Sequence, residues 1–302
     1  AEDPQLEELN WRKLLVLGAL PSAVFGALAY MYLVESPKYL ACRGDDTAAG
    51  KVLQAIGRTN GVPVVLPCSF EETATPKAEL GFWGCLRVVW GWRLGFTSWV
   101  ICFSTFTLNF LYYGGIYAFP QVLPGLRLDM SPGASIFLGA LMEMPGFLLA
   151  VWVTAVLSRK ATTLLYLTTT FMTVVLFLYG TGVDASLAVT EQKHPWAVHA
   201  GFLGMKAFVN VGFVVLYVYA SEVYPTVART TGTATCLAAG RLGAMACPMI
   251  FEGLKDVTET YHAFFLALAG LTVMNILLVC FLSIETAGMP LSDVVELDPL
   301  QS

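Results

Sequence analysis

The sequence predicts an all-α membrane protein with seven transmembrane helices. Hydrophobic residues make up 56% of the 302 residues and charged residues only 13%, and the mean hydropathy is +0.66. An ordinary soluble domain carries about 25% charged residues. Three charged residues, Glu143, Lys206 and Arg241, each lie in the middle of a different apolar segment. Such residues are rare in membranes and usually face a polar cavity, so they favour a solute pathway over a membrane anchor.

Each of seven apolar segments is long enough to cross about 30 Å of hydrocarbon. In chain order they are Leu14–Leu33, Phe96–Phe119, Ala134–Leu157, Leu164–Gly182, Ala197–Ala220, Thr230–Phe251 and Ala263–Ile284. The core of a soluble protein would not repeat such a segment seven times. We therefore expect a multi-pass integral membrane protein in contact with the lipid bilayer.

Residues 34–95 form the sizeable extramembrane connection after the first span. Asp45 and Asp46 are predicted to cap a short helix there, and Asn60-Gly61 to end it. The apolar stripe of this helix consists of Ala49, Val52, Leu53 and Ile56. An amphipathic helix against the membrane surface is expected, and the prolines that follow it indicate irregular chain.

The orientation follows from the Lys and Arg residues between the spans. The side that carries the 34–95 connection and the Arg159–Lys160 turn has ten of them, against five on the other side. The richer side is predicted to be cytoplasmic. The segment before the first span is then outside, and the tail at 285–302 is cytoplasmic.

Several classes of function lack support in the sequence. The net charge of −5 comes without a basic run that would indicate nucleic acid. His194 and His199 are five apart across a proline, which favours an ordinary loop over a metal site. Gly44–Lys51 imitates a phosphate-binding loop but has five residues between its glycines and Val52 after the lysine, so no ATP site is expected. No cofactor or metal is predicted, and transport energy would come from a gradient.

The three charged residues are predicted to lie at similar depth. Glu143 and Lys206 are each nine residues into their spans, roughly 13–14 Å, and Arg241 is eleven residues into its span. A cavity shared by all three has a formal charge of +1, which favours an anion, and arginine matches a carboxylate in geometry. Alternatively, Glu143 and Lys206 form a structural ion pair and Arg241 binds backbone carbonyls.

Polar and aromatic residues accompany these charges and complete the predicted substrate-binding set. They are Asn109, Tyr112, Tyr113, Asn210 and Tyr217. Asn210 is one turn from Lys206 on the same helix face. Gly114-Gly115 is a point where the second span can bend or break. Rings beside a cation would suit a flat aromatic acid, whereas the alternative for each tyrosine is simple packing.

Three stretches resemble signatures of major facilitator carriers. Val34–Leu40 (V-E-S-P-K-Y-L) resembles P-E-S-P-R-W/Y-L after their sixth helix, and Tyr219–Gly232 resembles the segment between their helices ten and eleven. Glu285–Leu291 resembles their P-E-T-x-G-x-x-L ending. The resemblance implies that the spans are helices six to twelve. Residues 1–33 would then end a missing amino-terminal helix bundle, and residues 96–284 would form the carboxyl-terminal six-helix bundle.

The resemblance also extends to a subgroup and to a gate. Asn109–Gly115, Glu143–Gly146 and Ala238–Ala244 look like carriers of nicotinate and aromatic acids, synaptic-vesicle-related proteins and animal organic ion carriers. In that last group the position of Arg241 is typically Arg in anion carriers and Asp in cation carriers, which implies an anion. Glu222 and Arg229 match cytoplasmic gate charges that pair in the outward-open state. Arg159 joins this gating set, although Thr154–Lys160 lacks the Asp and Gly of the family's loop.

Together these features predict a secondary carrier for a small organic anion, coupled to protons, that works by rocking of two bundles. Glu143 is the candidate proton-coupling residue, because burial raises the pKa of a carboxyl and a neighbouring lysine lowers it. The alternatives are a non-transporting half-carrier that acts as a binding or assembly module, and an organic cation or sugar carrier of the same superfamily. An intramembrane enzyme is not favoured, because no nucleophile–base pair occurs at span depth.

Overall fold

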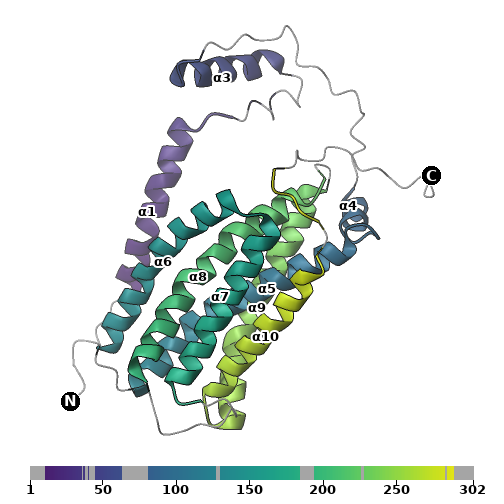
Figure 1. Ribbon diagram of the computed structural model, residues 1–302. Coiled ribbons are helices and arrows are strands. Elements are labelled where there is room, and N and C mark those ends of the chain that lie inside the picture. Colours follow the sequence, from purple (N-terminus) through teal and green to yellow (C-terminus); the bar gives the residue numbers. More distant parts are fainter. Residues whose placement is uncertain are drawn as a thin grey trace. The chain divides into compact units, whose positions relative to one another are not determined.

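The computed structural model describes residues 11–35, 37, 40, 45–62, 81–126, 130–183, 194–225, 228–282 and 284–288. All regular elements in these ranges are helices, as Figure 1 shows. The chain divides into two units, Ala1–Pro76 and Lys77–Ser302, which are described separately. The predicted tail lies outside the described residues from position 289 onward.

The first unit contains α1 (Trp11–Tyr32) and α3 (Asp46–Thr59). The carboxylate of Asp45 accepts a hydrogen bond of 3.0 Å from the amide of Ala48, which satisfies one free donor at the start of α3. Beyond the helix end, Gly61 has a φ of +69°, a conformation that glycine adopts without strain. Asp45 and Asn60-Gly61 therefore bound this helix as predicted.

The second unit is a bundle of long helices. In chain order it contains α4 (Phe82–Val89), α5 (Gly95–Val122), the short 3-10 helix η1 (Leu123–Leu126), α6 (Pro132–Val156), α7 (Arg159–Gly180), α8 (Pro195–Glu222), α9 (Arg229–Thr258) and α10 (His262–Cys280). The helices α1 and α5 to α10 are long and apolar enough to cross a membrane, which confirms the seven predicted spans. The protein is thus a multi-pass integral membrane protein.

The helix ends differ from the predicted ends where polar groups set them. α7 begins at Arg159, five residues before the apolar stretch, because the hydroxyl of Ser158 caps the amide of Ala161 at 3.2 Å. α10 ends at Cys280, before the predicted Ile284, and the ammonium of Lys160 donates to the carbonyl of Cys280 at 2.8 Å. α4 was not predicted.

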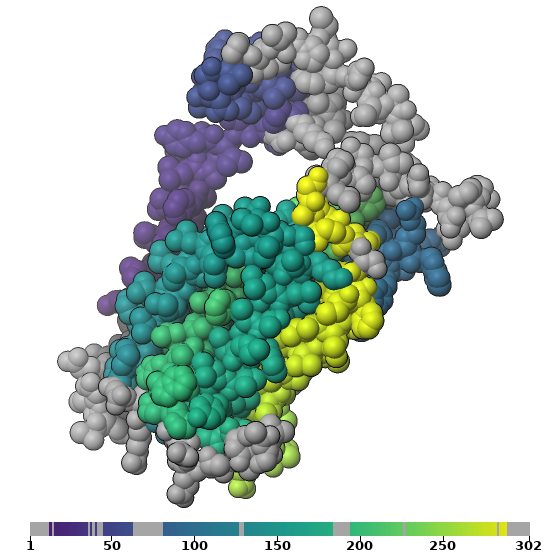
Figure 2. Space-filling model, viewed as in Figure 1, coloured from purple at the N-terminus to yellow at the C-terminus, as the bar shows by residue number. Residues whose placement is uncertain are grey.

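Within the second unit, α8 packs between α6 and α7, and α5 packs along α9 (Figure 1). Small residues permit the close approach that membrane helices use for association. A Cβ on Gly146 of α6 would collide with the backbone of Ala207 on α8. Figure 2 shows α6 in teal on the viewed face, and its side chains Phe137 and Leu148 are largely exposed, as expected for contact with lipid.

α5 does not break at Gly114-Gly115, one of the two possibilities that the sequence offered for this point. The helix runs without interruption from Gly95 to Val122. A Cβ on Gly114 would lie 2.9 Å from the ring of Phe264, so this glycine makes room for an aromatic side chain of α10. Both glycines therefore permit close side-chain packing against α5.

Candidate functional site

The centre of the second unit contains an ion pair between α6 and α8. The ammonium of Lys206 donates to Oε1 of Glu143 at 2.8 Å. The side chains are 14% and 27% exposed, respectively. The tight contact of Gly146 with Ala207, less than one turn further along α6, brings the two helices close enough for this pair. Each charge compensates the other in a region where an unpaired ion would be costly.

Tyr112 of α5 contacts both members of this pair, Glu143 through its hydroxyl and Lys206 through its ring. Its hydroxyl donates to Oε2 of Glu143 at 3.2 Å, and the ammonium of Lys206 lies 5.2 Å from the ring centroid. The distance to the centroid is within the range of a cation–π interaction. The side-chain amide of Asn210 donates to the carbonyl of Lys206 at 2.8 Å, so it lies one turn along the same helix. Three helices therefore meet at Glu143.

Arg241 of α9 lies beside the same tyrosines. Its Nη1 donates to the hydroxyl of Tyr113 at 3.2 Å, and the rings of Tyr112 and Tyr113 meet edge to face at 5.3 Å. Arg241 is exposed, and it forms no ion pair with any carboxylate in the described part of the chain. With Glu143 and Lys206 neutralising each other, the guanidinium leaves the cluster with a formal charge of +1.

Most of the predicted substrate-binding residues are thus connected, with one exception. Tyr217 joins through Phe213, whose ring contacts Tyr217 at 5.6 Å and Tyr112 at 5.1 Å. Phe213 was missed, although it is seven residues from Lys206 and therefore on the same helix face. Asn109 is the exception: it is buried, its side-chain amide donates to the carbonyl of Thr105, and it packs against Gly240.

A second charged cluster lies at the end of the bundle where α7 begins and α8 ends. The guanidinium of Arg159 donates to both oxygens of Glu222, at 3.0 and 2.9 Å. The hydroxyl of Thr286 donates to the same carboxylate at 2.7 Å. Of the predicted gating residues, Arg159 is therefore the partner of Glu222. Arg229 instead donates to the carbonyl of Tyr224 at 3.3 Å.

Glu285 was missed as a member of this cluster, although it is in the E-T-A-G motif. Its carboxylate accepts from the amides of Arg159, Lys160 and Ala287 at 2.9, 3.2 and 3.1 Å. Partial burial raises the pKa of Glu285, but the amides of Ala287, Arg159 and Lys160 outweigh it, so the pKa lies below its ordinary value. An acidic group at the start of α7 also interacts favourably with the helix dipole.

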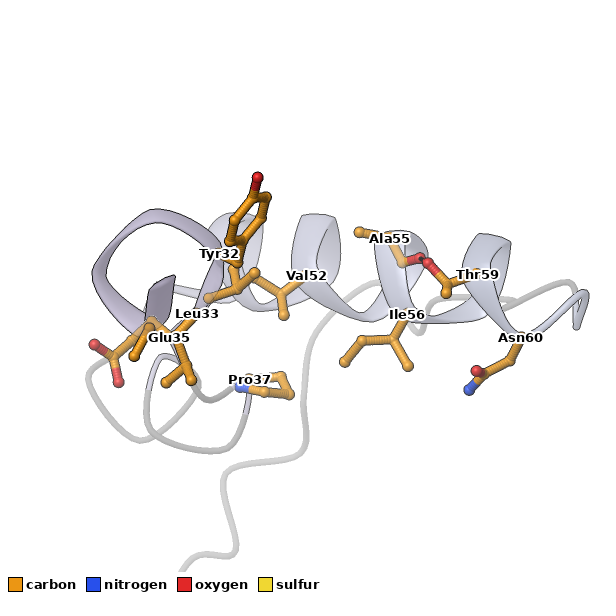
Figure 3. Close-up of a pocket in the computed structure, with 11 residues that line it drawn as sticks. Tyr32, Leu33, Glu35, Pro37, Val52, Ala55, Ile56, Thr59 and Asn60 are labelled. Atoms are coloured by element: carbon orange, nitrogen blue, oxygen red, sulfur yellow. Dashed lines mark hydrogen bonds between the residues drawn. The ribbon is translucent and has the colours of Figure 1, made fainter. Parts of the chain in front are cut away.

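A groove in the first unit contains none of the predicted site residues. It has a volume of about 500 Å³ and lies between the end of α1 and the side of α3. Its lining includes Leu33, Pro37, Val52 and Ile56, which Figure 3 labels. Its lining is mostly apolar and offers little polar chemistry for a small solute. In the described ranges, His, Cys, Asp and Glu side chains nowhere gather in threes that could hold a metal ion.

The sequence of the chain matches a known family of proteins. The model of the family described as "Sugar (and other) transporter" matches residues 5–297. The Synaptic vesicle 2-related protein of Xenopus laevis is 28% identical over 308 residues, which cover 94% of this chain and 52% of that protein.

The names of two further relatives include the solutes that they transport. The Organic cation/carnitine transporter 7 of Arabidopsis thaliana is 24% identical, over 96% of this chain and 64% of its own length. The Niacin transporter NiaP of Acinetobacter baylyi is also 24% identical, over 96% and 62%. The chain spans between about half and two thirds of the length of these relatives.

Proposed function

The chain belongs to the sugar (and other) transporter family, and we propose that it carries a small organic anion across the membrane by alternating access. The family consists of membrane transporters rather than enzymes. The observation that carries the proposal is the exposed guanidinium of Arg241, which has a tyrosine hydroxyl but no carboxylate of the described chain as its partner. A planar guanidinium binds a carboxylate through two parallel hydrogen bonds.

The ion pair beside Arg241 supplies the second part of the proposal. Glu143 already holds Lys206 and the hydroxyl of Tyr112. Protonation of Glu143 would release the ammonium of Lys206, which could then contact an anionic substrate. Proton binding and anion binding would thus favour each other, as in a symporter. Glu143 is accordingly the proposed proton-coupling residue, and Tyr112, Tyr113, Asn210 and Tyr217 the proposed lining.

The Arg159–Glu222 pair is proposed to act in gating rather than in substrate contact. It joins α7 to α8 at one end of the bundle and also holds Thr286 beyond α10. Alternating access requires such contacts to form in one state and break in another. Because the chain spans only part of its relatives, we propose that transport needs a further helix bundle, in the same protein or a partner.

The proposal is tested by substitution of Arg241 in the full-length carrier. Uptake of radiolabelled nicotinate or benzoate into proteoliposomes should fall at least about 10-fold in Arg241→Ala, since a charge-assisted pair is lost. Arg241→Asp should favour cationic probes. Arg58→Gln, which removes an exposed arginine of α3, is the matched control and should leave uptake unchanged. Normal uptake by a well-folded Arg241→Ala protein would reject the proposed role.

A further inference from the structure

Four of the seven tryptophans of the chain lie between positions 83 and 99, around α4 and the start of α5. Trp83 of α4 is 80% exposed, and Trp92, in the turn after α4, is fully exposed. Phe82, Trp90 and Phe96 are exposed as well. These five residues form an aromatic surface on the bundle, and a contiguous apolar patch of this kind marks a site of interaction.

The packing of α4 explains why part of this surface points outward. Cys85 and Val89 are buried, and α4 packs on α9. Trp83, Arg87 and Trp90 have the spacing i, i+4 and i+7, so they share the other face of the helix. The hydroxyl of Ser98 on α5 donates to the carbonyl of Val89 at 2.7 Å, which ties the end of α4 to the start of α5.

α4 lies at the level where the bundle enters the membrane. The membrane-spanning helix α5 begins at Gly95, one short turn after α4 (Figure 1). The hydroxyl of Tyr224, just beyond the end of α8, donates to the hydroxyl of Ser98 at 3.1 Å. α4 is therefore at the same end of the bundle as the Arg159–Glu222 pair. The Lys and Arg distribution predicts that this end is cytoplasmic.

Two exposed arginines accompany the aromatic rings. They are Arg87 of α4 and Arg93 of the following turn, and residues 81–99 contain no acidic residue, so this segment has a formal charge of +2. Tryptophan is enriched at the headgroup level of membranes, and the cytoplasmic leaflet carries the anionic lipids. A guanidinium also matches a phosphate through two parallel hydrogen bonds.

We propose that α4 and the turn after it bind anionic phospholipid at the membrane interface. The rings of Trp83 and Trp92 lie among the upper acyl chains, and Arg87 and Arg93 bind the headgroup phosphates. The other face of α4 stays on α9, the helix that carries Arg241, so bound lipid holds the ends of α5 and α9 at the membrane surface. This lipid binding does not depend on which solute the carrier moves.

The depth of the two tryptophans is tested by fluorescence quenching in the full-length carrier, reconstituted into phosphatidylcholine vesicles. Their signal is the difference between the unmodified carrier and the double variant Trp83→Phe with Trp92→Phe, which keeps an aromatic ring at each exposed position. Lipids with bromine near the headgroup should quench this signal more strongly than lipids with bromine at the chain end. Quenching by aqueous iodide alone would show that the rings face water. Quenching by neither would show that protein covers them, such as a further helix bundle, and either result would overturn the inference.

The preference for anionic lipid is tested in detergent by titration with brominated phosphatidylglycerol or phosphatidylcholine of the same chains. Phosphatidylglycerol should bind more tightly, by about 5-fold for each arginine near its headgroup. Arg87→Gln should therefore lower the preference about 5-fold, and Arg87→Gln with Arg93→Gln should remove most of it. Arg87→Lys keeps the charge and should retain most of the preference.

The matched control is Lys255→Gln, which removes an exposed positive charge 26 residues beyond the start of α9 at Arg229, or about 39 Å away along the helix. It should leave the preference unchanged, whereas a loss equal to that in Arg87→Gln would show that only the overall charge attracts lipid. Equal binding of the two lipids by the unmodified carrier, or a preference unchanged in the double arginine variant, would also overturn the inference. Uptake that depends on Arg241 reports separately on the proposed function and can persist when lipid binding fails.

Discussion

The two internal ion pairs of the bundle have different geometry. Arg159 and Glu222 form two parallel hydrogen bonds at 3.0 and 2.9 Å, and Thr286 and the carbonyl of Thr154 hold the same groups in place. Lys206 instead makes one contact with Glu143 at 2.8 Å. A guanidinium fork fixes the orientation of its partner, whereas an ammonium is a point charge that can move among acceptors.

The geometry of the Arg159–Glu222 pair is suited to holding two helices together. The geometry of the Lys206–Glu143 pair is suited to an exchange of partners. The Arg159 pair joins α7, α8 and the segment after α10 and has several supports, so it must break as a unit. The Lys206 pair lies beside the tyrosines that lead to Arg241 and has an aromatic face as a second support. Partner exchange at Lys206 therefore needs little rearrangement of the backbone.

The largest effect is expected when Lys206 is removed alone. In Lys206→Met, Glu143 would remain as an uncompensated charge within the bundle. The loss in stability should be about 3 kcal/mol, the size found when one partner of a mostly buried pair is deleted. The double variant Lys206→Met with Glu143→Gln should recover most of this loss. Thermal unfolding in detergent measures both, and a double variant as unstable as the single one would show that the pair is not the cause.

A smaller effect is expected at the other pair. Arg159→Lys keeps the positive charge but cannot make both hydrogen bonds to Glu222. The free energy of unfolding should therefore fall by about 1 kcal/mol. Lys206→Arg is the reciprocal control, because it keeps the charge of the single-contact pair. A double-mutant cycle of Arg159→Lys with Glu222→Gln isolates the interaction. A coupling energy near zero would mean that the fork adds nothing to the contact.

The sequence predicts a structural feature best when the residues that determine it are close together in the chain. The spans follow from local hydrophobicity, and α3 follows from Asp45 and Asn60-Gly61, which lie next to the ends they set. α4 begins after Gly81 without a side-chain cap and has eight residues, so it left no such signal.

Contacts between residues that are far apart in the sequence were harder to predict. The sequence indicated that Glu143 and Lys206 lie at one depth, and their pairing was one of two alternatives. That Glu222 contacts Arg159 rather than Arg229 depends on which helices pack together, and Arg159 and Glu222 are 63 positions apart in the sequence. Likewise, Gly114 is next to Phe264 only because α10 packs on α5, so its role in packing could not be distinguished from a kink.

The smallest expected effect concerns the carboxyl that supports the Arg159 cluster. Because backbone amides hold the pKa of Glu285 below its ordinary value of 4.5, its ionised form stabilises the fold at neutral pH. This contribution is fully present above about pH 4.5 and is lost as the pH falls through the lower, folded-state pKa. Relative to the unmodified protein, Glu285→Gln should lower the melting temperature by about 1–4 °C at pH 7 and by less at pH 4.

Asp256→Asn, which changes a carboxyl at the opposite end of the bundle, controls for loss of a negative charge in general. Its effect on melting should not follow the pH window of Glu285→Gln. If the difference between the unmodified protein and Glu285→Gln stays constant from pH 7 to pH 4, ionisation of Glu285 does not stabilise the start of α7. The support of the Arg159 pair would then come from Thr286 and Thr154, and the contrast with the single-contact Lys206 pair would depend on the guanidinium fork alone.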